Sequence, residues 1–368
     1  MTHCSHKYRA YPTDCQAQLL AKTFGCARFV WNSILDWRSK EYALHGTKIG
    51  YAKSTARLTE MKQSDELAWL YEVSNVALQQ SLRNQDKAFS NFFAKRGKYP
   101  ALKSKHDKQS IRLTSNAFRI KEGKLFIAKS DEPLHFVESR HLPEKVSSIT
   151  ISKDAAGRYF VAFQGEAEKR TLPINEKSIG IDLGLDSFIA TSDGEKIATP
   201  KIYRKYEARL ARFQRKLSRK QKGGNNRNKA RIKVARIHAR IADTRKDFLH
   251  KLSTRIIREN QTVSVEDLNV AGMQKNRKLA KSISDASWSE FVRQLEYKAS
   301  WYGRSFVKIS RWYPSSQICS ACGHLDGKKA LKVRRWTCSS CGTILDRDIN
   351  AAKNINTAGL AEIEACQT

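Results

Sequence analysis

Three acidic residues stand where carboxylates can do chemistry. Asp182 lies in an apolar run with Ile179 and Ile181, Glu266 ends a second apolar run, and Asp348 stands just before the start of a helix. A carboxylate among apolar residues is costly unless it binds a cation or hydrogen-bond donors. Mg²⁺ prefers oxygen ligands, and two such ions can stabilise both the attacking and the leaving oxygen of a phosphoryl transfer. The three acids together therefore predict a divalent-metal phosphodiesterase site.

Each acid also has a simpler interpretation. An aspartate after a strand is often a turn former or a helix cap, and this applies most directly to Asp346 and Asp348 in LDRDINAAKNI. We favour the metal site because all three acids occur at the end of a strand or the start of a helix, in the order strand, strand, helix.

Four cysteines form a second group with metal-ligand spacing. Cys319 and Cys322 make one C-x-x-C pair, Cys338 and Cys341 make another, and 15 residues separate the pairs. Two such pairs supply four thiolates, which predicts a structural zinc site with no open coordination position. Free thiols or disulfides are the alternative, but disulfide frameworks are typical of short secreted chains. We interpret His324 as lying outside the coordination sphere.

The loop between the two cysteine pairs is basic and carries one aromatic residue. It can contact phosphates and stack on a base, or it can be a solvated tip, and the sequence leaves both interpretations open. The residues concerned are Lys328, Lys329, Lys332, Arg334, Arg335 and Trp336.

The charge of the chain predicts a polyanionic partner. Its 368 residues include 68 Lys and Arg against 36 Asp and Glu, which gives a formal net charge of +32. A surplus of this size repels itself in a folded protein, so nucleic acid is the expected partner. An anionic membrane surface is the weaker alternative, because no apolar run has spanning length. At 40% hydrophobic residues the chain can bury cores, which excludes wholesale disorder.

One segment concentrates this charge. Residues 201–258 hold 21 Lys and Arg and 3 Asp and Glu, a net +18, and the pattern predicts two helices broken at residues 223–226. A solvated face does not explain so dense a charge, whereas contact with nucleic-acid phosphates does. The arginines expected to make such contacts are Arg209, Arg212, Arg215, Arg219, Arg231 and Arg236.

The hydrophobic pattern indicates an α/β multidomain protein. Residues up to about 105 read as mostly helical, with one helix capped by Thr13-Asp14 and another over residues 68–96. Alternation over residues 110–165 predicts antiparallel strands. Further strands are expected at three places within 178–198, at 262–268 and at 305–310, and helices at 288–302 and from Asp348 onward. In the first half, polar side chains able to read base edges are Gln79, Gln80, Arg83, Asn84 and Asn116.

These motifs occur together in one known family. GIDLG (residues 180–184), VEDL (265–268) and the paired cysteines followed by DRDINAAKNI resemble the three-part RuvC-type nuclease core of the TnpB (OrfB) family. That family is encoded by insertion sequences and is related to the type V CRISPR effectors. In the first half, YRAYPTDCQAQLL, ARFVWN and NVALQQSLRNQDKAFSNFF are also similar, so the resemblance spans nearly the whole chain.

The resemblance implies a fold, a reaction and partners. It implies an RNase H-like nuclease part with Asp182, Glu266 and Asp348 as the three acids, ahead of their neighbours Asp186, Asp193, Asp267 and Asp346. It also implies an RNA-guided endonuclease that cleaves double-stranded DNA beside a short flanking motif, with base pairing to the guide RNA reading the sequence. The cofactors would be two Mg²⁺ ions and one structural zinc. Neither a membrane nor a small-molecule substrate is expected.

A division into four parts follows from the motifs and the resemblance. We expect a β-rich, barrel-like nucleic-acid-binding part at residues 1–15 and 106–172, and a helical recognition part at 16–105. The RuvC-like part takes 173–316 and 343–368. Residues 317–342, here called the cysteine module, hold the zinc. A chain of this length is not a typical disulfide scaffold, and it lacks a signal-peptide pattern, so we expect a bacterial or archaeal cytoplasm and association with the nucleoid.

Three other functions compete with this one. An acid-triad transposase would share the fold and the metal chemistry, but a cysteine module just before the third acid favours TnpB. A nuclease-inactive DNA-binding repressor would be marked by a missing acid, and all three are present. A zinc protein associated with RNA or the ribosome would explain the charge and the cysteines but not the acids in apolar runs.

Overall fold

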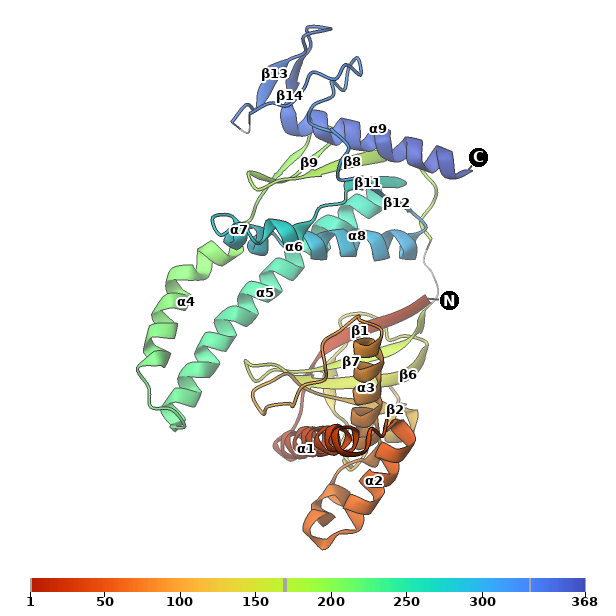
Figure 1. Ribbon diagram of the computed structural model, residues 1–368, viewed down its shortest axis with the longest axis vertical. Coiled ribbons are helices and arrows are strands. Elements are labelled where there is room, and N and C mark those ends of the chain that lie inside the picture. The colour runs from red at the N-terminus through yellow and green to blue at the C-terminus, as the bar shows by residue number, and fades with distance from the viewer. Residues whose placement is uncertain (1, 168–170, 331, 368) are drawn as a thin grey trace. The chain divides into compact units, whose positions relative to one another are not determined.

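The chain forms two compact units, Met1–Glu168 and Lys169–Thr368, in a computed structural model that describes residues 2–167, 171–330 and 332–367 (Figure 1). No helix among these residues is long and apolar enough to cross a membrane. The two units are a coarser division than the four parts expected from the sequence, which stay a prediction.

The first unit contains a five-stranded antiparallel sheet in the order β2-β6-β7-β1-β5. The strands are β1 (Thr2–Tyr11), β2 (Gln109–Thr114), β5 (His135–Val137), β6 (Lys145–Lys153) and β7 (Tyr159–Ala167), and β3 (Phe118–Lys121) pairs with β4 (Lys124–Ile127) in a separate hairpin. Strand β1 pairs with β7 on one side and β5 on the other, so the start of the chain is hydrogen-bonded to residues more than 120 positions later. Strands β2 and β5 end the described sheet, so the expected barrel is not confirmed.

Helices pack against this sheet in one shared core. Helix α1 (Asp14–His45) begins at a capping box, in which Thr13 Oγ1 accepts from the Gln16 amide and Gln16 Oε1 accepts from the Thr13 amide. The helix expected over residues 68–96 is wrong at its start: a 3₁₀ helix, η1 (Asp65–Glu72), precedes α3 (Asn75–Phe93). The chain is extended at Val73 and Ser74, and serine is a preferred residue at a helix start. The remaining helices are α2 (Tyr51–Gln63) and η2 (Ser115–Ala117).

The second unit is built on a five-stranded mixed sheet in the order β10-β9-β8-β11-β12. Strands β8, β11 and β12 run parallel, and β9 and β10 are antiparallel to their neighbours. Their bounds are β8 (Ser178–Leu183), β9 (Ser187–Thr191), β10 (Lys196–Ala198), β11 (Thr262–Glu266) and β12 (Ser305–Ile309). The three strands expected within residues 178–198 are present.

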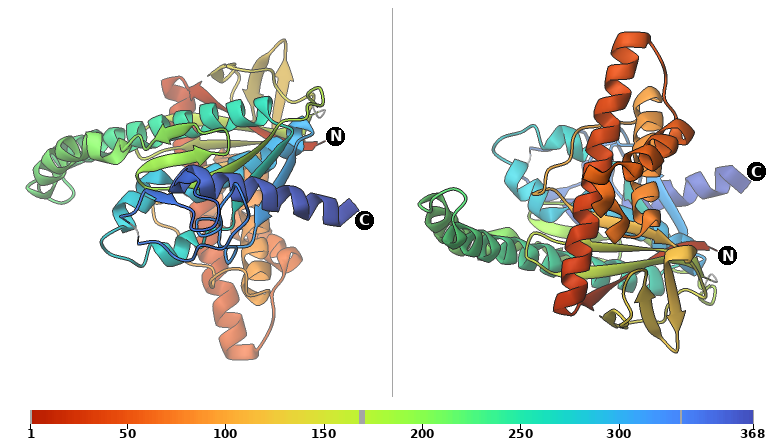
Figure 2. Two further views of the ribbon diagram at one scale, coloured as in Figure 1. Left: turned by 90° about the horizontal axis from the view of Figure 1, so that it is seen from above. Right: turned by 90° about the horizontal axis from the view of Figure 1, so that it is seen from below.

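Helices cover both faces of this second sheet (Figures 1 and 2). Helices α5 (Asn225–Glu259) and α8 (Trp288–Tyr302) bury one face together with the apolar side chains of β8 and β11. Helix α9 (Arg347–Gln367) lies on the other face and approaches closely, since a Cβ atom at Gly180 would stand 2.0 Å from the Ala352 carbonyl oxygen. Glycine at position 180 is therefore what allows α9 to lie directly on β8.

A helical hairpin extends from the second unit (Figure 1). Helix α4 (Ile202–Ser218) runs against the first half of α5, and a small apolar cluster of Ile202, Leu210, Ile237 and Ile241 holds the two together. The break expected at residues 223–226 is close to the observed one, because α5 begins at Asn225. Between α5 and α9 lie α6 (Val270–Met273), α7 (Ala280–Ala286) and the cysteine module with β13 (Arg335–Thr337), which pairs with β14 (Ile344–Asp346).

Candidate functional site

The two strand acids lie on the sheet face that α9 covers. Side chains alternate along a strand, and because Gly180 meets α9, Asp182 two residues later points to the same side. On β11, Ser264 meets Gly359 of α9, so Glu266 also faces α9. The strands are parallel neighbours with Val265 opposite Ile181, which makes Glu266 and Asp182 adjacent across the sheet.

The third acid comes from the first turn of α9. Asp346 Oδ1 accepts hydrogen bonds from the amides of Asp348, at 3.1 Å, and Ile349, at 3.2 Å. Asp346 thus caps the helix, which is the simpler role that the sequence allows for both Asp346 and Asp348. The Asp348 side chain is not used in this cap, and its carboxylate is 19% exposed.

Asp182 and Asp348 line one cavity of about 260 Å³, here called the acid cavity, and Glu266 does not line it. Burial raises the pKa of Asp182 to about 7, and the negative charges of Asp348 and Glu266 add to that effect. Burial and the charge of Asp267 also raise the pKa of Glu266. Burial and neighbouring negative charge thus oppose the ionisation of Asp182 and of Glu266, and a bound cation would relieve that cost. The acid cavity is lined by Asp182, Gly184, Leu185, Asp186, Ser187, Ala190, Leu279, Arg334 and Asp348.

Two basic side chains reach Asp348. Lys196 Nζ of β10 stands 2.7 Å from Asp346 Oδ1 and 3.0 Å from Asp348 Oδ2. Arg334 of the cysteine module stands 3.5 Å from Asp348 and also pairs with Asp186. Burial by itself would lower the pKa of Lys196, but its bonds to Asp346 and Asp348 raise it overall. Lys196 could not be identified from the sequence, because a lysine after a hairpin turn belongs to no motif.

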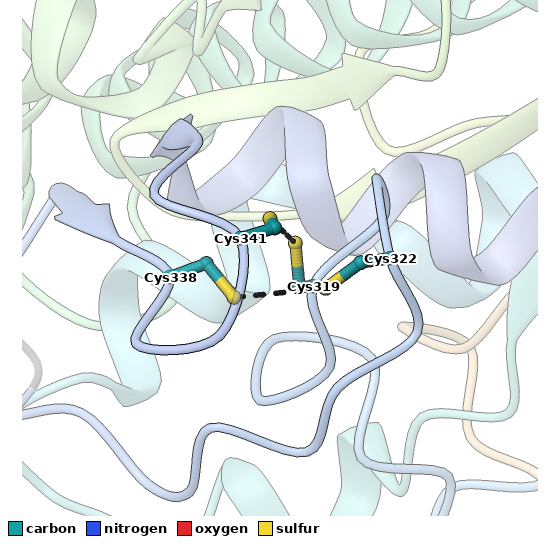
Figure 3. A group of neighbouring side chains, drawn as sticks. All are labelled: Cys319, Cys322, Cys338 and Cys341. Atoms are coloured by element: carbon teal, nitrogen blue, oxygen red, sulfur yellow. Dashed lines mark hydrogen bonds between the residues drawn. The ribbon is translucent and has the colours of Figure 1, made fainter.

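The four cysteines do come together (Figure 3). Their four sulfur atoms all lie within 4.8 Å of one another. Among the residues that the structure describes, no other group of three or more His, Cys, Asp or Glu side chains is placed to hold a metal ion in this way. The sulfur atoms of Cys319 and Cys341 are 3.7 Å apart, and those of Cys322 and Cys338 are 3.7 Å apart. A tetrahedral zinc with bonds of about 2.3 Å needs sulfurs about 3.8 Å apart, so the four cysteines fit a zinc site. The three carboxylates are not gathered as tightly.

Some residues of the basic loop of the cysteine module make contacts within the module itself. Trp336 is only 6% exposed and packs with Cys319, Cys338 and Leu345, so the idea that it stacks on a base is wrong for this conformation. Lys329 donates to Asp326 and lies over the Trp336 ring. His324 is exposed and outside the sulfur cluster, as interpreted from the sequence. Lys328, Lys332 and Arg335 are exposed and stay candidates for phosphate contact.

The six arginines proposed on the basic segment are at least partly exposed. Arg209 and Arg236 line one groove of about 370 Å³ between α4 and α5, together with Arg240 and Lys233. Within the described residues, no carboxylate forms an ion pair with any of the six: Arg209, Arg212, Arg215, Arg219, Arg231 and Arg236. This face therefore carries uncompensated positive charge, as a phosphate-binding surface requires.

The polar residues proposed in the first unit are dispersed. Gln79, Gln80, Arg83 and Asn84 lie on α3, whereas Asn116 lies in η2. Arg83 and Asn84 are exposed, but Gln80 is 9% exposed and has little surface for a base edge. Asn84 lines a small cavity of about 70 Å³ with Arg28, Lys103 and other residues, and Gln79 and Gln80 do not.

Models of known domains match three parts of the chain. Residues 161–277 match a domain described as "Probable transposase" (OrfB_IS605), and this range includes Asp182 and Glu266. Residues 288–355 match "Cas12f1-like, TNB domain", which includes the four cysteines and Asp348. Residues 1–47 match a helix-turn-helix domain. Asp182 and Glu266 thus fall in one matched domain and Asp348 in another, although Asp182 and Asp348 line the same cavity in the folded chain.

Whole-chain relatives carry consistent names. The chain is 52% identical over 96% of its length, and 89% of the relative, to a "Putative RNA-guided DNA endonuclease" of Streptomyces pristinaespiralis. It is 31% identical, over 98% of its length and 93% of the relative, to the "Putative RNA-guided DNA endonuclease InsQ" of Escherichia coli (strain K12). A cryo-EM structure of a Cas12f1–sgRNA–target DNA complex matches with a TM-score of 0.58 at 14% identity, covering 94% of this chain and 83% of that one. The mixed α/β fold therefore resembles that of a Cas12 effector.

Proposed function

The chain belongs to the TnpB (OrfB) family, and from that membership we propose that it is an RNA-guided DNA endonuclease that hydrolyses phosphodiester bonds of double-stranded DNA with Mg²⁺. The observation that carries the proposal is the meeting of three acids on one face of the sheet. Asp182 and Glu266 come from neighbouring parallel strands, and Asp348 comes from the helix that covers them.

The topology supports an RNase H-like core. If the strands of the five-stranded mixed sheet are numbered in chain order from β8 to β12, they lie side by side as 3-2-1-4-5. The second strand is antiparallel to the first, and the fourth and fifth run parallel to it. The first acid is on the first of these strands and the second acid on the fourth. With Asp348 on the last helix, the acids follow the order of the three motifs by which the sequence resembles a RuvC-type nuclease.

The acids supply what the reaction needs. Bound Mg²⁺ would stabilise charge on the scissile phosphate and lower the pKa of the attacking water. Asp182, Glu266 and Asp348 are the oxygen ligands that would hold it. In hydrolysis the water oxygen forms a bond to phosphorus, the bond from phosphorus to the leaving oxygen breaks, and that oxygen takes a proton. Lys196 and Arg334 are close enough to Asp348 to orient its carboxylate and to face a phosphate.

The other two sites are the cysteine cluster, which would stabilise the fold, and the basic helices, which would bind nucleic acid. The four cysteines would bind one structural zinc, which leaves no position for catalysis. The exposed arginines of α4 and α5 would contact the backbone of a guide–target heteroduplex or of the guide RNA. The polar residues of α3 and η2 stay candidates for reading a flanking motif, with Gln80 the least accessible of them.

A reconstituted cleavage assay tests the proposal. The protein is purified with the RNA that it retains, the RNA is sequenced, and matching double-stranded DNA is incubated with Mg²⁺, with Mn²⁺ and with chelator. We expect metal-dependent double-strand cleavage that requires the RNA. Tight guided binding without cleavage in either metal would support the nuclease-inactive repressor instead, and RNA-independent strand transfer would support a transposase.

A further inference from the structure

Two buried asparagines of α9 hold the first cysteine pair in place. Asn350 Nδ2 donates to the Ile318 carbonyl oxygen at 2.7 Å, and Asn350 Oδ1 accepts from the Ser320 amide at 2.8 Å. These are the peptide groups on either side of Cys319. Asn354 Nδ2 donates to the carbonyl oxygens of Ile318 and Ser315, both at 2.7 Å. The direction in which Cys319 presents its sulfur is thus set by the side chains of α9.

The second cysteine pair is attached to the same helix by the chain itself. Cys341 is followed by β14, which runs directly into α9 at Asp346 and Arg347. Asp346 caps the helix, and the Arg347 amide donates to the Arg334 carbonyl oxygen at 2.9 Å. The first two turns of α9 are therefore connected to both cysteine pairs, by covalent continuity on one side and by Asn350 and Asn354 on the other.

A metal held by all four sulfurs would close these connections into a ring. The ring runs from Cys319 through Asn350 to the first turn of α9, back along β14 to Cys341, and across the metal to Cys319. Asp348 lies within this first turn. It stands two residues before Asn350, so about 200° of helical rotation separates their side chains. The asparagines face the cysteine module, whereas Asp348 reaches toward Lys196 and the acid cavity.

The burial of the two amides shows that this contact is specific. Asn350 is 1% exposed and Asn354 is 5% exposed. A buried amide without hydrogen bonds is unfavourable, so these side chains are fixed only while the Ser315–Ser320 segment stays in place. A shift of that segment therefore leaves polar groups of α9 unsatisfied, and the first turn of the helix must adjust.

We propose that Asn350 and Asn354 are positioning residues that couple metal occupancy of the four cysteines to the placement of Asp348. Loss of that metal then weakens the acid site without any change in the acids. This inference rests on the proposed function, because it takes Asp348 as a ligand of the catalytic ion. It gives the cysteine module a role in the reaction besides stability.

The test measures two metals in the full-length protein without relying on cleavage. Zinc release to a chromogenic chelator reports on the cysteines, and Mn²⁺ binding followed by electron paramagnetic resonance reports on the acids. The variants are Asn354→Ala and the isosteric Asn354→Asp, which keeps the volume but turns an acceptor toward two carbonyl oxygens. Asn356→Ala is the matched control, because that asparagine lies on the same helix but donates to Ser178 on β8.

Coupled sites affect each other reciprocally, and typical couplings are about 5- to 150-fold. We expect both Asn354 variants to release zinc at least about fivefold faster than wild type and, while still loaded with zinc, to bind Mn²⁺ about fivefold or more weakly. Asn356→Ala should release zinc at the wild-type rate. Wild-type zinc release in the Asn354 variants, or wild-type Mn²⁺ affinity in variants that release zinc quickly, overturns the coupling.

An Asp348→Ala background separates this inference from the proposed function. If Asn354 acts through Asp348, Asn354→Ala lowers Mn²⁺ affinity in the wild-type background and causes no further loss in Asp348→Ala. A further loss of the same size in that background shows that Asn354 acts elsewhere and overturns the coupling. If Asp348→Ala by itself leaves Mn²⁺ binding unchanged, it is the assignment of the third acid that fails.

Discussion

Asp182 and Asp348 line the same cavity although they belong to the first strand and the last helix of their unit. Burial raises the pKa of Asp182 to about 7, and the charge of Asp348 is the next largest cause. A buried carboxylate whose ionisation a neighbouring negative charge opposes gains stability from a bound cation. The structure offers Lys196 as a cation beside them, bound to Asp348 at 3.0 Å.

The first prediction concerns the choice of third acid. Asp348→Ala should lower cleavage by at least about 10²-fold, because it removes a ligand of the Mg²⁺ that would stabilise the transition state. Asp346→Ala should instead cost stability, roughly 1 kcal/mol for a missing helix cap, and leave most of the cleavage. Cleavage rates with guide and Mg²⁺, together with thermal melting, distinguish the two effects.

Asp182→Ala and Glu266→Gln serve as positive controls for this comparison. Both should abolish cutting while guided DNA binding persists, because the proposed binding surface is on the basic hairpin and the first unit. If Asp346→Ala stops cleavage and Asp348→Ala does not, the two roles assigned here are reversed.

The second prediction concerns the contact between α9 and β8. Gly180→Ala should destabilise the second unit by about 1–3 kcal/mol or more, because the new methyl group would overlap the backbone of Ala352 and Asn356. It should also impair cleavage, since α9 must move away from the strand that carries Asp182. Chemical denaturation and cleavage rates give the two measurements.

Gly25→Ala provides the matched control for that substitution. Gly25 lies within α1, and a Cβ atom there meets nothing within 4 Å. Alanine is the better helix former, so this variant should be as stable as wild type or up to about 1 kcal/mol more stable. A Gly180→Ala protein with wild-type stability and cleavage would contradict the close-packing argument.

Much of the second unit was predictable from the sequence because its signals are local. The runs around Ile179 and Val263 predict strands, and the cysteine spacing predicts the cluster that is observed. The sequence also leaves Asp346 and Asp348 as alternatives, and only the hydrogen bonds at the start of α9 show which one caps the helix. Lys196 could not be found because its importance comes from strand pairing, which places β10 near α9.

Other features depend on contacts between distant segments. Strand β1 pairs with residues 135–137 and 159–167, and its own residues give little sign of these partners. The expectation that residues 1–15 belong with residues 106–172 comes from the family resemblance and not from the local pattern. Asn350 and Asn354 look like ordinary helix residues until the Ser315–Ser320 segment folds against them. Trp336 is an aromatic residue in a basic loop, which suggests stacking on a base, but it is buried in the cysteine module. A module this small uses the large aromatic side chain to build its core.

The third prediction concerns zinc. Metal-washed protein should contain about one zinc per chain, and Cys338→Ser should lose it and destabilise the cysteine module. Elemental analysis and limited proteolysis around residues 317–342 measure the two effects. Cys15→Ser is a suitable control, because Cys15 is an exposed cysteine in the first unit and should not affect zinc content. A folded, zinc-free wild-type protein would rule out the structural metal.

The fourth prediction concerns the basic hairpin. Replacing Arg209, Arg212 and Arg215 with glutamine should lower the slope of log affinity against log salt by roughly one unit for each phosphate that is no longer bound. A control triple variant, Arg57, Arg255 and Arg293 to glutamine, removes the same charge from arginines that pair with carboxylates. Binding of guide RNA over a range of salt concentrations tests the difference. Equal slopes in the two variants would mean that α4 does not contact phosphates.

The last prediction concerns a buried lysine and the pH dependence of stability. Lys298 of α8 is 5% exposed, and its Nζ donates to the His250 carbonyl oxygen, Ser253 Oγ and Thr254 Oγ1 at 2.7–2.9 Å. Burial lowers its pKa from 10.5 to about 8. The unfolded chain therefore binds this proton more tightly than the folded one, so between about pH 8 and 10.5 the unfolded state holds more protons. Folding stability from this group must rise with pH across that window.

Lys298→Met removes the pH-dependent contribution of this lysine to folding stability, so comparison with wild type tests the predicted direction. Below about pH 8 the wild type carries the full cost of a buried ammonium, about 3 kcal/mol for a shift of this size, partly offset by the three hydrogen bonds. As the pH rises from about 8 to about 10, wild type should gain stability relative to Lys298→Met, and urea denaturation at several pH values measures the difference. The exposed Lys251→Met removes the same formal charge without removing a buried ammonium. If the stability difference between wild type and Lys298→Met is constant from about pH 7 to about pH 10, the ammonium is as well solvated in the folded protein as in the unfolded chain.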